Sequence, residues 1–237
     1  SLDAMLALTA HDMNAVNAVI LERMQSEIPL IPELAGHLIA GGGKRMRPML
    51  TLASARMIGY TGSRHHRLAA AVEFIHTATL LHDDVVDEST MRRGRPTANE
   101  SFGNAASVLV GDFLYSRAFQ MMVSTNRLRV MEVLADATNV IAEGEVLQLT
   151  RAHDLNLEQE TYLKIISAKT AELFAAAAES GAVGAGAEDA VIKAMRDYGM
   201  ALGIAFQLAD DVIDLMSDSA TTGKTPGTDL REGVATL

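Results

Sequence analysis

Two segments of the chain end an apolar, helix-periodic run with the same acidic pattern, Asp-Asp-x-x-Asp. The six aspartates of the two copies are Asp83, Asp84, Asp87, Asp210, Asp211 and Asp214. Positions i and i+4 of a helix face the same way, about 5–6 Å apart at Cβ, so the outer pair of each copy can share a cation. Any fold for this chain must therefore accommodate two acidic helix ends.

Carboxylates gathered inside a protein repel one another unless a cation lies between them. Mg²⁺ removes this repulsion, because it prefers oxygen ligands and usually binds one or two carboxylates together with phosphate oxygens. One acidic cluster alone is equally well explained as a solvated helix end. Two clusters, each ending an apolar helix, favour a site that holds a diphosphate through several metal ions.

The sequence contains no alternating apolar and polar run bounded by turn signals, which predicts an all-α protein. Helices are expected over residues 3–25, 32–39, 48–58, 64–88, 104–123, 127–150, 157–181 and 188–216. Loops are expected at 94–101 and 217–237. Long helices with short connections favour a single-domain bundle of antiparallel helices around a central cavity, with residues 1–237 as the one domain. In such a bundle the two acidic helix ends can face each other.

Composition narrows the possible partners. The formal net charge of −10 argues against nucleic acid as the main partner. The chain has no cysteine, which excludes disulfides, thiolate nucleophiles and cysteine-based zinc sites. Neither a signal-peptide pattern nor an uninterrupted apolar stretch of about 18 residues is visible. We therefore expect a cytoplasmic protein without a membrane span.

A second group of candidate residues is basic. Residues 41–48 read Gly-Gly-Gly-Lys-Arg-Met-Arg-Pro and place a flexible turn directly before Lys44 and Arg47. Glycine allows a ligand to approach the backbone closely, and arginine binds phosphate through a bidentate fork. Arg92 and Arg93 follow the first acidic cluster and can contact phosphate oxygens that the metals leave uncovered. An ordinary helix start with surface charges is the alternative for 41–48.

The acidic and basic groups together predict two anion sites, one that depends on metal and one that does not. Two such sites in one apolar helical protein suggest transfer between two phosphorylated hydrophobic molecules. These motifs resemble those of the trans-isoprenyl diphosphate synthases, the polyprenyl synthetase family. The resemblance covers almost the whole chain, and its most specific segments are 41–48, 76–99, 168–173, 206–214 and 223–229.

The resemblance implies an enzyme that condenses isopentenyl diphosphate head-to-tail with an allylic diphosphate, assisted by about three Mg²⁺ ions. The allylic diphosphate would ionise, the double bond of isopentenyl diphosphate would attack the allylic cation, and a proton would then be lost. The departed diphosphate is the expected acceptor of that proton, so no side chain is needed as a covalent nucleophile.

The resemblance also implies a role for each matching residue. The metal ligands would be Asp83, Asp87, Asp210 and Asp214. The catalytic residues would be Asp83, Asp84, Asp87, Lys169 and Asp210, with Asp211 in support. The allylic diphosphate would contact Arg92, Lys169 and Lys224. Isopentenyl diphosphate would contact Lys44, Arg47, His76 and Arg93. The reaction centre would be lined by Thr170 and Gln207.

Product length is expected to depend on the residues about one helical turn before Asp83. Ala78 and Thr79 are small, whereas relatives with short products resemble one another in carrying bulky aromatics there. The resemblance therefore implies a long all-trans product, such as octaprenyl or decaprenyl diphosphate for quinone side chains. The alternative is that these small residues only permit close helix packing, and that the product is farnesyl or geranylgeranyl diphosphate.

Two other classes of protein share parts of this pattern. Terpene cyclases carry the first acidic motif but usually lack the 41–48 segment, and non-catalytic partner subunits tend to lose aspartates or cations that are intact here. The resemblance suggests a homodimer, with the apolar helix at 104–123 as interface. It also suggests that helices found in relatives beyond Leu237 are absent, and that Val234 replaces a lysine that would contact the allylic diphosphate.

Overall fold

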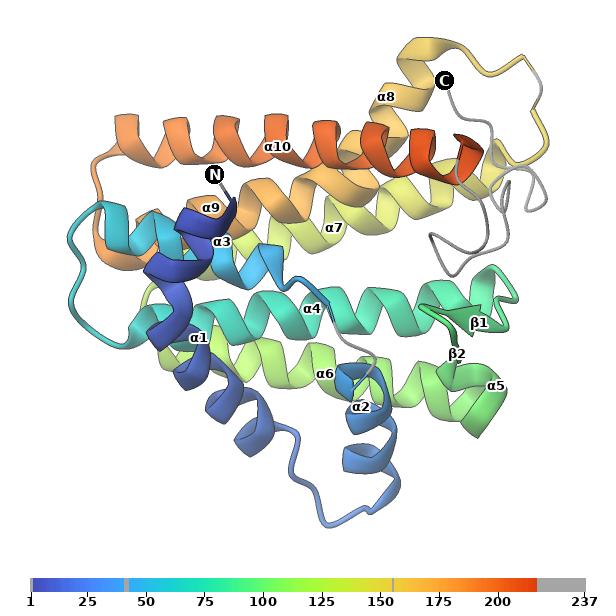
Figure 1. Cartoon of the computed structure of the whole chain (residues 1–237), viewed down its shortest axis with the longest axis horizontal. Coiled ribbons are helices and arrows are strands. Elements are labelled where there is room, and N and C mark those ends of the chain that lie inside the picture. The colour runs from blue at the N-terminus through green and yellow to red at the C-terminus, as the bar shows by residue number, and fades with distance from the viewer. Residues whose placement is uncertain (1, 41–42, 155, 217–237) are drawn as a thin grey trace.

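The computed structural model describes residues 2–40, 43–154 and 156–216, and these are almost entirely helical (Figure 1). The α-helices are α1 (Leu2–Arg23), α2 (Leu30–Ala40), α3 (Met46–Met57), α4 (Arg64–Val86), α5 (Ala98–Phe102), α6 (Asn104–Ser124), α7 (Leu128–Thr150), α8 (Gln159–Ile166), α9 (Glu172–Ala185) and α10 (Asp189–Met216). A single π-helical turn, η1 (Ser167–Ala171), joins α8 to α9. The predicted all-α class is confirmed. The predicted loop at 217–237, with Lys224 and Val234, lies outside the described residues.

Most predicted helix boundaries differ from the structure by a few residues, and three differences have a clear physical reason or add an element. Helix α2 begins at Leu30, ahead of Pro32, because the first turn of a helix tolerates a residue without a backbone donor. The helix predicted over 157–181 is divided by η1, since one extra residue is accommodated there without ending the helical path. Helix α5 lies in a segment predicted as loop, and it is only five residues long.

A short β-hairpin follows α4, where the sequence predicted no strand. Strands β1 (Met91–Arg92) and β2 (Arg95–Pro96) pair antiparallel. Arg93 and Gly94 form the turn with φ values of 51° and 74°. Positive φ at both central residues is typical of the hairpin turn that matches strand twist. Strands of two residues are too short to show an alternating pattern, which is why the sequence did not reveal them.

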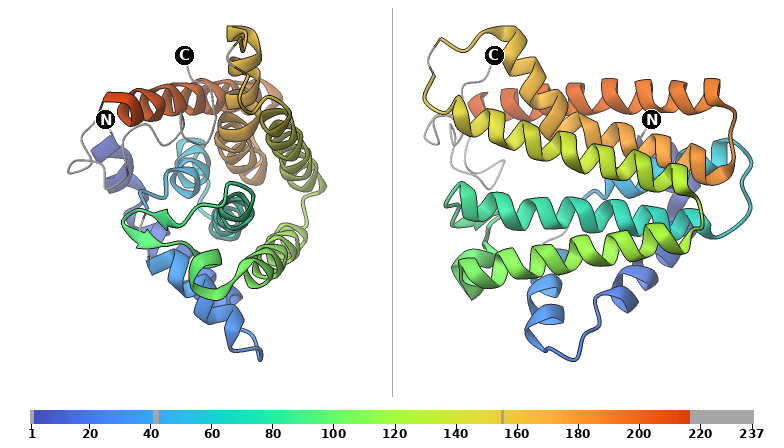
Figure 2. Two further views of the ribbon diagram at one scale, coloured as in Figure 1. Left: turned by 90° about the vertical axis from the view of Figure 1, so that its right-hand side faces the viewer. Right: turned by 180° about the vertical axis from the view of Figure 1, so that it is seen from behind.

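Helix α4 lies at the centre of the bundle and packs against α6, α3, α9 and α1 (Figure 2). Its core-facing side chains include the fully buried Phe74, Ile75 and Leu81. Helix α9 is alanine-rich and buried along almost its whole length, so neighbouring helices approach its backbone closely. The Thr51 hydroxyl, for example, donates to the carbonyl of Ala177 at 2.9 Å.

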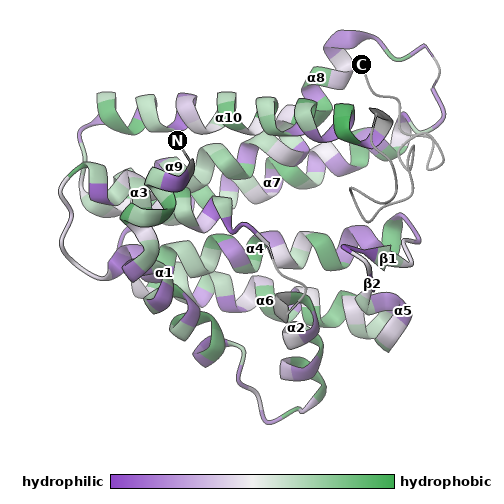
Figure 3. Cartoon of the chain, in the orientation of Figure 1, coloured by the Kyte–Doolittle hydropathy of each residue, from purple (hydrophilic) through white to green (hydrophobic). Residues whose placement is uncertain are grey.

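The C-terminal ends of α4 and α10 lie at the same end of the bundle, as Figures 1 and 2 both show. The β-hairpin lies at this end too, and the nearby part of α4 carries hydrophilic residues in Figure 3. The two acidic motifs are therefore brought to one end of the molecule, as the sequence analysis required.

Among the described residues, the segment Asp3–Arg23 is long and apolar enough to cross a membrane by length and composition alone. One helix of this kind near the N-terminus is weak evidence for a span. Helix α1 also contributes Val16 and Ile20 to the core, and its Asp12 is buried against Arg56 of α3. These contacts bind α1 to the bundle.

Candidate active site

The first acidic motif closes α4, and its three aspartates differ in environment. Asp84 is buried and accepts hydrogen bonds from Arg92, at 2.7 Å from Nη2 and 3.0 Å from Nε. The β-hairpin thus holds Arg92 against the helix end. Burial raises the pKa of Asp83 to about 7, and the carboxylates of Glu145 and Asp87 add to this rise against the opposing charge of Lys169. Asp83 therefore lies in an acidic cluster that lacks full compensation.

The second acidic motif, near the end of α10, is organised in the same way. Asp211 is buried and accepts hydrogen bonds from the Tyr162 hydroxyl and, at 2.7 Å, from Nε2 of Gln207. Asp210 is exposed and Asp214 is half-buried. In both motifs the second aspartate is thus an anchor within the protein, and the neighbouring aspartates carry the more accessible carboxylates.

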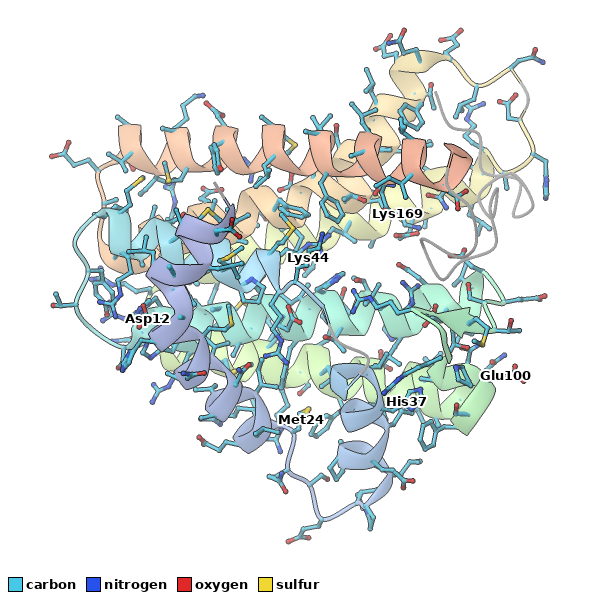
Figure 4. All side chains as sticks on the ribbon, in the orientation of Figure 1. Asp12, Met24, His37, Lys44, Glu100 and Lys169 are labelled. Atoms are coloured by element: carbon cyan, nitrogen blue, oxygen red, sulfur yellow. The ribbon has the colours of Figure 1, made fainter. Side chains whose placement is uncertain are left out.

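Lys169 and Thr170, on the π-turn η1, connect the two motifs. Lys169 Nζ forms an ion pair with Glu145 Oε2 of α7 at 2.8 Å, and its charge also acts on Asp83. The Thr170 hydroxyl donates to Gln207 Oε1 at 2.7 Å, and Gln207 in turn holds Asp211. In Figure 4, Lys169 falls between the ribbons of α4 and α10. A chain of interactions therefore joins the end of α4 to the end of α10, electrostatic between Asp83 and Lys169 and hydrogen-bonded from Thr170 through Gln207.

Two glycines allow η1 to sit between α7 and α10. A Cβ atom on Gly144 of α7 would lie 2.7 Å from the Ala168 Cβ and 3.1 Å from the Lys169 nitrogen. A Cβ atom on Gly203 of α10 would lie 2.5 Å from the Ala171 Cα. Only glycine permits such close approach without displacement of the backbone. Glu145, directly after Gly144, and Gln207, one helical turn after Gly203, can consequently reach the side chains of the π-turn.

The basic residues gather around the middle of α4. Arg47 Nη1 donates to His76 Nε2 at 3.2 Å, and the Arg47 guanidinium lies 4.3 Å from the ring centroid of Phe174. Burial lowers the pKa of Arg47 to about 10. Burial, with the charges of Arg47, Arg92 and Arg93, lowers the pKa of His76 well below its ordinary value. His76 is therefore a neutral acceptor that orients Arg47.

Arg93 joins this basic group from the hairpin turn. Its Nη1 would lie 2.9 Å from a Cβ atom on Gly43, so the glycine makes room for the guanidinium. Lys44, the residue after Gly43, is exposed. In Figure 4 it lies, like Lys169, between α4 and α10. Arg47, His76 and Arg93 are thus brought together, as expected for an anion site, and the site extends toward Arg92.

The remaining predicted residues are Ala78 and Thr79 of α4. Ala78 is fully buried in the core, and the Thr79 hydroxyl donates to the His76 carbonyl at 2.7 Å. A hollow of about 440 Å³ lies elsewhere, beside the π-turn, and Gly144, Lys164, Ala168 and Met200 are among its lining residues. None of the predicted aspartates lines that hollow.

Sequence reasoning assigned no role to Glu145, Glu73 or Tyr162. Glu145 forms an ion pair with Lys169. Burial raises the pKa of Glu73, although the charges of Arg45, Arg47 and Arg93 oppose this rise. Glu73 lies in an apolar run of α4, a signal that could have pointed to it, whereas Glu145 is one of several acidic residues on α7. Tyr162 offers no such signal, because its partner Asp211 is 49 residues away in sequence.

The donor set at the acidic end fits Mg²⁺. It consists of carboxylate oxygens from Asp83, Asp87, Asp210 and Asp214, the ligand type that hard divalent cations prefer. The raised pKa of Asp83 marks a concentration of negative charge that such a cation would relieve. No nitrogen or sulfur donor is needed.

Comparison with known proteins gives a consistent result. The polyprenyl synthetase family model matches residues 28–237. Octaprenyl diphosphate synthase of Escherichia coli is 54% identical over the whole of this chain, which covers 73% of that protein.

Two crystal structures are also similar over the whole chain. A Caulobacter crescentus polyprenyl synthase complexed with calcium and isoprenyl diphosphate is 59% identical, with a TM-score of 0.97 and 72% of its chain covered. A Rhodobacter capsulatus decaprenyl diphosphate synthase is 57% identical, with a TM-score of 0.95 and 73% of its chain covered. Together with the paired acidic helix ends, these similarities show that the chain belongs to the polyprenyl synthetase family and is a trans-polyprenyl diphosphate synthase, a prenyltransferase.

Proposed function

We propose that this prenyltransferase condenses isopentenyl diphosphate with an allylic diphosphate to give a long-chain all-trans polyprenyl diphosphate, in a Mg²⁺-dependent reaction. The observation that best supports the site is Lys169, whose charge acts on Asp83 and Asp87 of the first acidic motif, while its neighbour Thr170 is linked through Gln207 to Asp211 of the second. The octaprenyl and decaprenyl relatives, each more than half identical, support the long product. The calcium and isoprenyl diphosphate bound to the Caulobacter relative support a divalent cation beside a prenyl diphosphate.

Asp83, Asp87, Asp210 and Asp214 would hold about three Mg²⁺ ions, which supply positive charge to the departing diphosphate. Lys169 would exchange its ion pair with Glu145 for the allylic diphosphate, and Arg92 and Lys224 would add further positive charge. Asp84 and Asp211 position these groups through Arg92, Gln207 and Tyr162. Such prearranged charge stabilises the transition state without reorganisation during the reaction.

Isopentenyl diphosphate would be held by Lys44, Arg47 and Arg93, with His76 orienting Arg47. Thr170 and Gln207, hydrogen-bonded to each other, would line the reaction centre between the two diphosphates. The allylic C–O bond breaks, the isopentenyl double bond attacks the allylic carbon, and the departed diphosphate accepts the proton that is lost. Exclusion of water protects the allylic cation from hydrolysis.

The experiment is chromatography of the product that the purified protein forms from isopentenyl diphosphate, farnesyl diphosphate and Mg²⁺. We expect a product of hexaprenyl length or longer, and no reaction after chelation of the metal. A product that stops at geranylgeranyl length would refute the long-chain assignment. A cyclised hydrocarbon would refute chain elongation itself.

Thr79→Phe tests how product length is set. Thr79 is half-buried about one helical turn before Asp83, so an aromatic ring there should block the growing chain and shorten the product by several isoprene units. The control is Thr150→Phe, an exposed position at the end of α7. An unchanged product from Thr79→Phe would show that another residue ends elongation.

The protein is further proposed to be a cytoplasmic homodimer. The exposed apolar residues of α6 support this assembly, because they offer a surface on a helix whose opposite face packs on α4.

A further inference from the structure

A second cluster of ligand-type side chains lies far from the aspartates, at the start of α4. It comprises Asp12 of α1 and the adjacent His65 and His66 of α4. Asp12 appears at the opposite side of the bundle from Lys169 in Figure 4. Eighteen residues separate His65 from Asp83 along one straight helix, a distance of about 27 Å at 1.5 Å per residue. The diphosphate site therefore does not include this cluster.

The donor atoms of the cluster already have the spacing of metal ligands. His66 Nε2 lies 2.9 Å from Asp12 Oδ1, and His65 Nε2 lies 3.4 Å from Asp12 Oδ2. One ligand atom from each residue falls within 4.8 Å of the others. Ligand atoms about 2.0–2.1 Å from a tetrahedral Zn²⁺ lie about 3.3 Å from one another. Small shifts of the two imidazoles would bring all three onto one ion.

His65 provides independent evidence for a missing partner. Its side chain is completely buried, yet neither ring nitrogen has a hydrogen-bond partner in the part of the chain that the structure describes. A buried polar group without a partner destabilises the folded state, because it loses its hydrogen bonds to water. The 3.4 Å contact of Nε2 with Asp12 does not form a hydrogen bond. A metal ion bound to Nε2 would give this nitrogen a partner.

A fourth donor is close at hand. His11 precedes Asp12 on α1, and its Nδ1 lies 3.9 Å from Asp12 Oδ1. The His11 side chain is 95% exposed, so it can turn toward the cluster without repacking of the core. Imidazole nitrogen and carboxylate oxygen are both ligands that Zn²⁺ takes in proteins, and four of them complete a tetrahedral site.

Asp12 already forms an ion pair with Arg56 of α3, so a metal ion would have to bind beside this positive charge. Arg56 donates to both carboxylate oxygens of Asp12, each at 2.6 Å. A carboxylate accepts about four hydrogen bonds or ligands, so these two bonds leave lone pairs for a metal. The Arg56 side chain is 31% exposed and can withdraw toward solvent. The positive charge of Arg56 nevertheless opposes a cation bound to the same carboxylate.

We propose that Asp12, His65 and His66, with His11 as fourth ligand, form a structural Zn²⁺ site that fastens α1 to α4. Imidazole selects a borderline ion such as Zn²⁺, whereas the all-oxygen diphosphate site selects Mg²⁺. The two sites would therefore take different metals in the same molecule. The zinc would add a crosslink between two helices that already pack directly against each other and share the contact of His66 with Asp12.

The test measures Zn²⁺ binding to the metal-stripped full chain by equilibrium dialysis in a large excess of Mg²⁺, which occupies the aspartate motifs. We expect one tightly bound Zn²⁺ per chain, a higher melting temperature in its presence, and Co²⁺ absorption bands typical of tetrahedral coordination. The variant Asp83→Asn should keep this zinc, because its substitution lies in the other site. A stoichiometry near zero in excess Mg²⁺ would overturn the proposal.

Three variants locate the ion. His66→Gln keeps a hydrogen-bond donor for Asp12 but is a poor metal ligand. It should weaken Zn²⁺ binding at least about tenfold, because even the loss of a residue that only orients a metal ligand has an effect of this size. His153→Asn, at an exposed turn, should bind zinc as the wild type does. Arg56→Gln removes the competing charge and should bind zinc more tightly. Equal affinities in His66→Gln and His153→Asn would show that the cluster is only a hydrogen-bonded contact between helices.

Discussion

Within each acidic motif the aspartates divide into anchors and accessible carboxylates. Asp84 and Asp211 are buried and hydrogen-bonded to neighbouring side chains, whereas Asp83 and Asp210 have no such partner among the described residues. An anchored residue holds the end of the helix in position, and the accessible residues then meet the ligand. Substitution of an accessible aspartate should therefore affect catalysis much more than folding.

The first prediction concerns Asp83→Asn. The substitution keeps the size of the side chain but removes the charge that would bind Mg²⁺, a contribution of several kcal/mol. We expect kcat/KM to fall by at least about 100-fold, which corresponds to about 2.7 kcal/mol. The measurement is steady-state turnover over a range of Mg²⁺ concentrations. Asp136→Asn, on the exposed face of α7, is the matched control and should retain full activity.

The second prediction concerns His76 and pH. A base whose pKa is lower in the folded than in the unfolded state binds fewer protons when folded. Below about pH 6.5, the pKa of histidine in the unfolded chain, the unfolded state binds the extra proton. The free energy of unfolding should therefore fall as pH falls, by up to about 1.4 kcal/mol per pH unit. Denaturant titrations at several pH values, from about 5 to about 7.5, measure how the free energy of unfolding depends on pH.

The variants His76→Gln and His153→Asn make this measurement specific. His76→Gln should remove up to one proton from the pH dependence of stability, and His153→Asn should leave that dependence unchanged. If both variants keep the wild-type slope, His76 is not the buried neutral group that the contact with Arg47 requires.

At the scale of elements, the π-turn η1 determines how the site is assembled. It lies against Gly144 of α7 and Gly203 of α10, and it directs Lys169 toward Glu145. An extra residue within a helical path is typical of functional sites, since it reorients side chains without ending the helix. The position of Lys169 should therefore depend on close contact with both helices.

The third prediction is that Gly144→Ala damages both stability and catalysis. The added Cβ would lie 2.7 Å from the Ala168 Cβ, so η1 must shift. We expect a loss of about 1–3 kcal/mol in unfolding free energy, as for other overpacked cores. We also expect a lower kcat, because Lys169 moves with η1. Gly36→Ala, within α2, meets no atom within 4 Å and should be neutral or stabilising.

The long helices could be predicted from the sequence, whereas the β-hairpin and the π-turn could not. Apolar periodicity predicted the long helices, because each buries a continuous stripe, and the repeated motif placed both acidic helix ends. The β-hairpin and η1 were missed, since their positions depend on tertiary contacts such as those of Arg92 and Gly144 rather than on local pattern. The same holds for Tyr162, whose role appears only when α8 meets α10.

At the scale of the whole molecule, α6 presents an apolar stripe to solvent. Val108, Phe119 and Val123 are spaced eleven and four positions apart, so they face the same direction on the helix. The exposed fractions of Phe119 and Val123 are 37% and 57%. Apolar side chains aligned in this way are typical of the core of a homodimer interface.

The fourth prediction is that Phe119→Glu combined with Val123→Glu converts the proposed dimer to a monomer. Each dimer would bring two copies of both charges into an apolar contact, and unpaired charges are costly to bury. Size-exclusion chromatography with light scattering should show the mass of the variant falling to half, with unchanged helical circular dichroism. Val191→Glu, on the exposed side of α10, is the control and should remain dimeric. A variant that keeps the dimer mass would place the interface on another face, and the exposed apolar residues of α7, such as Val146 and Leu149, would be the next to substitute.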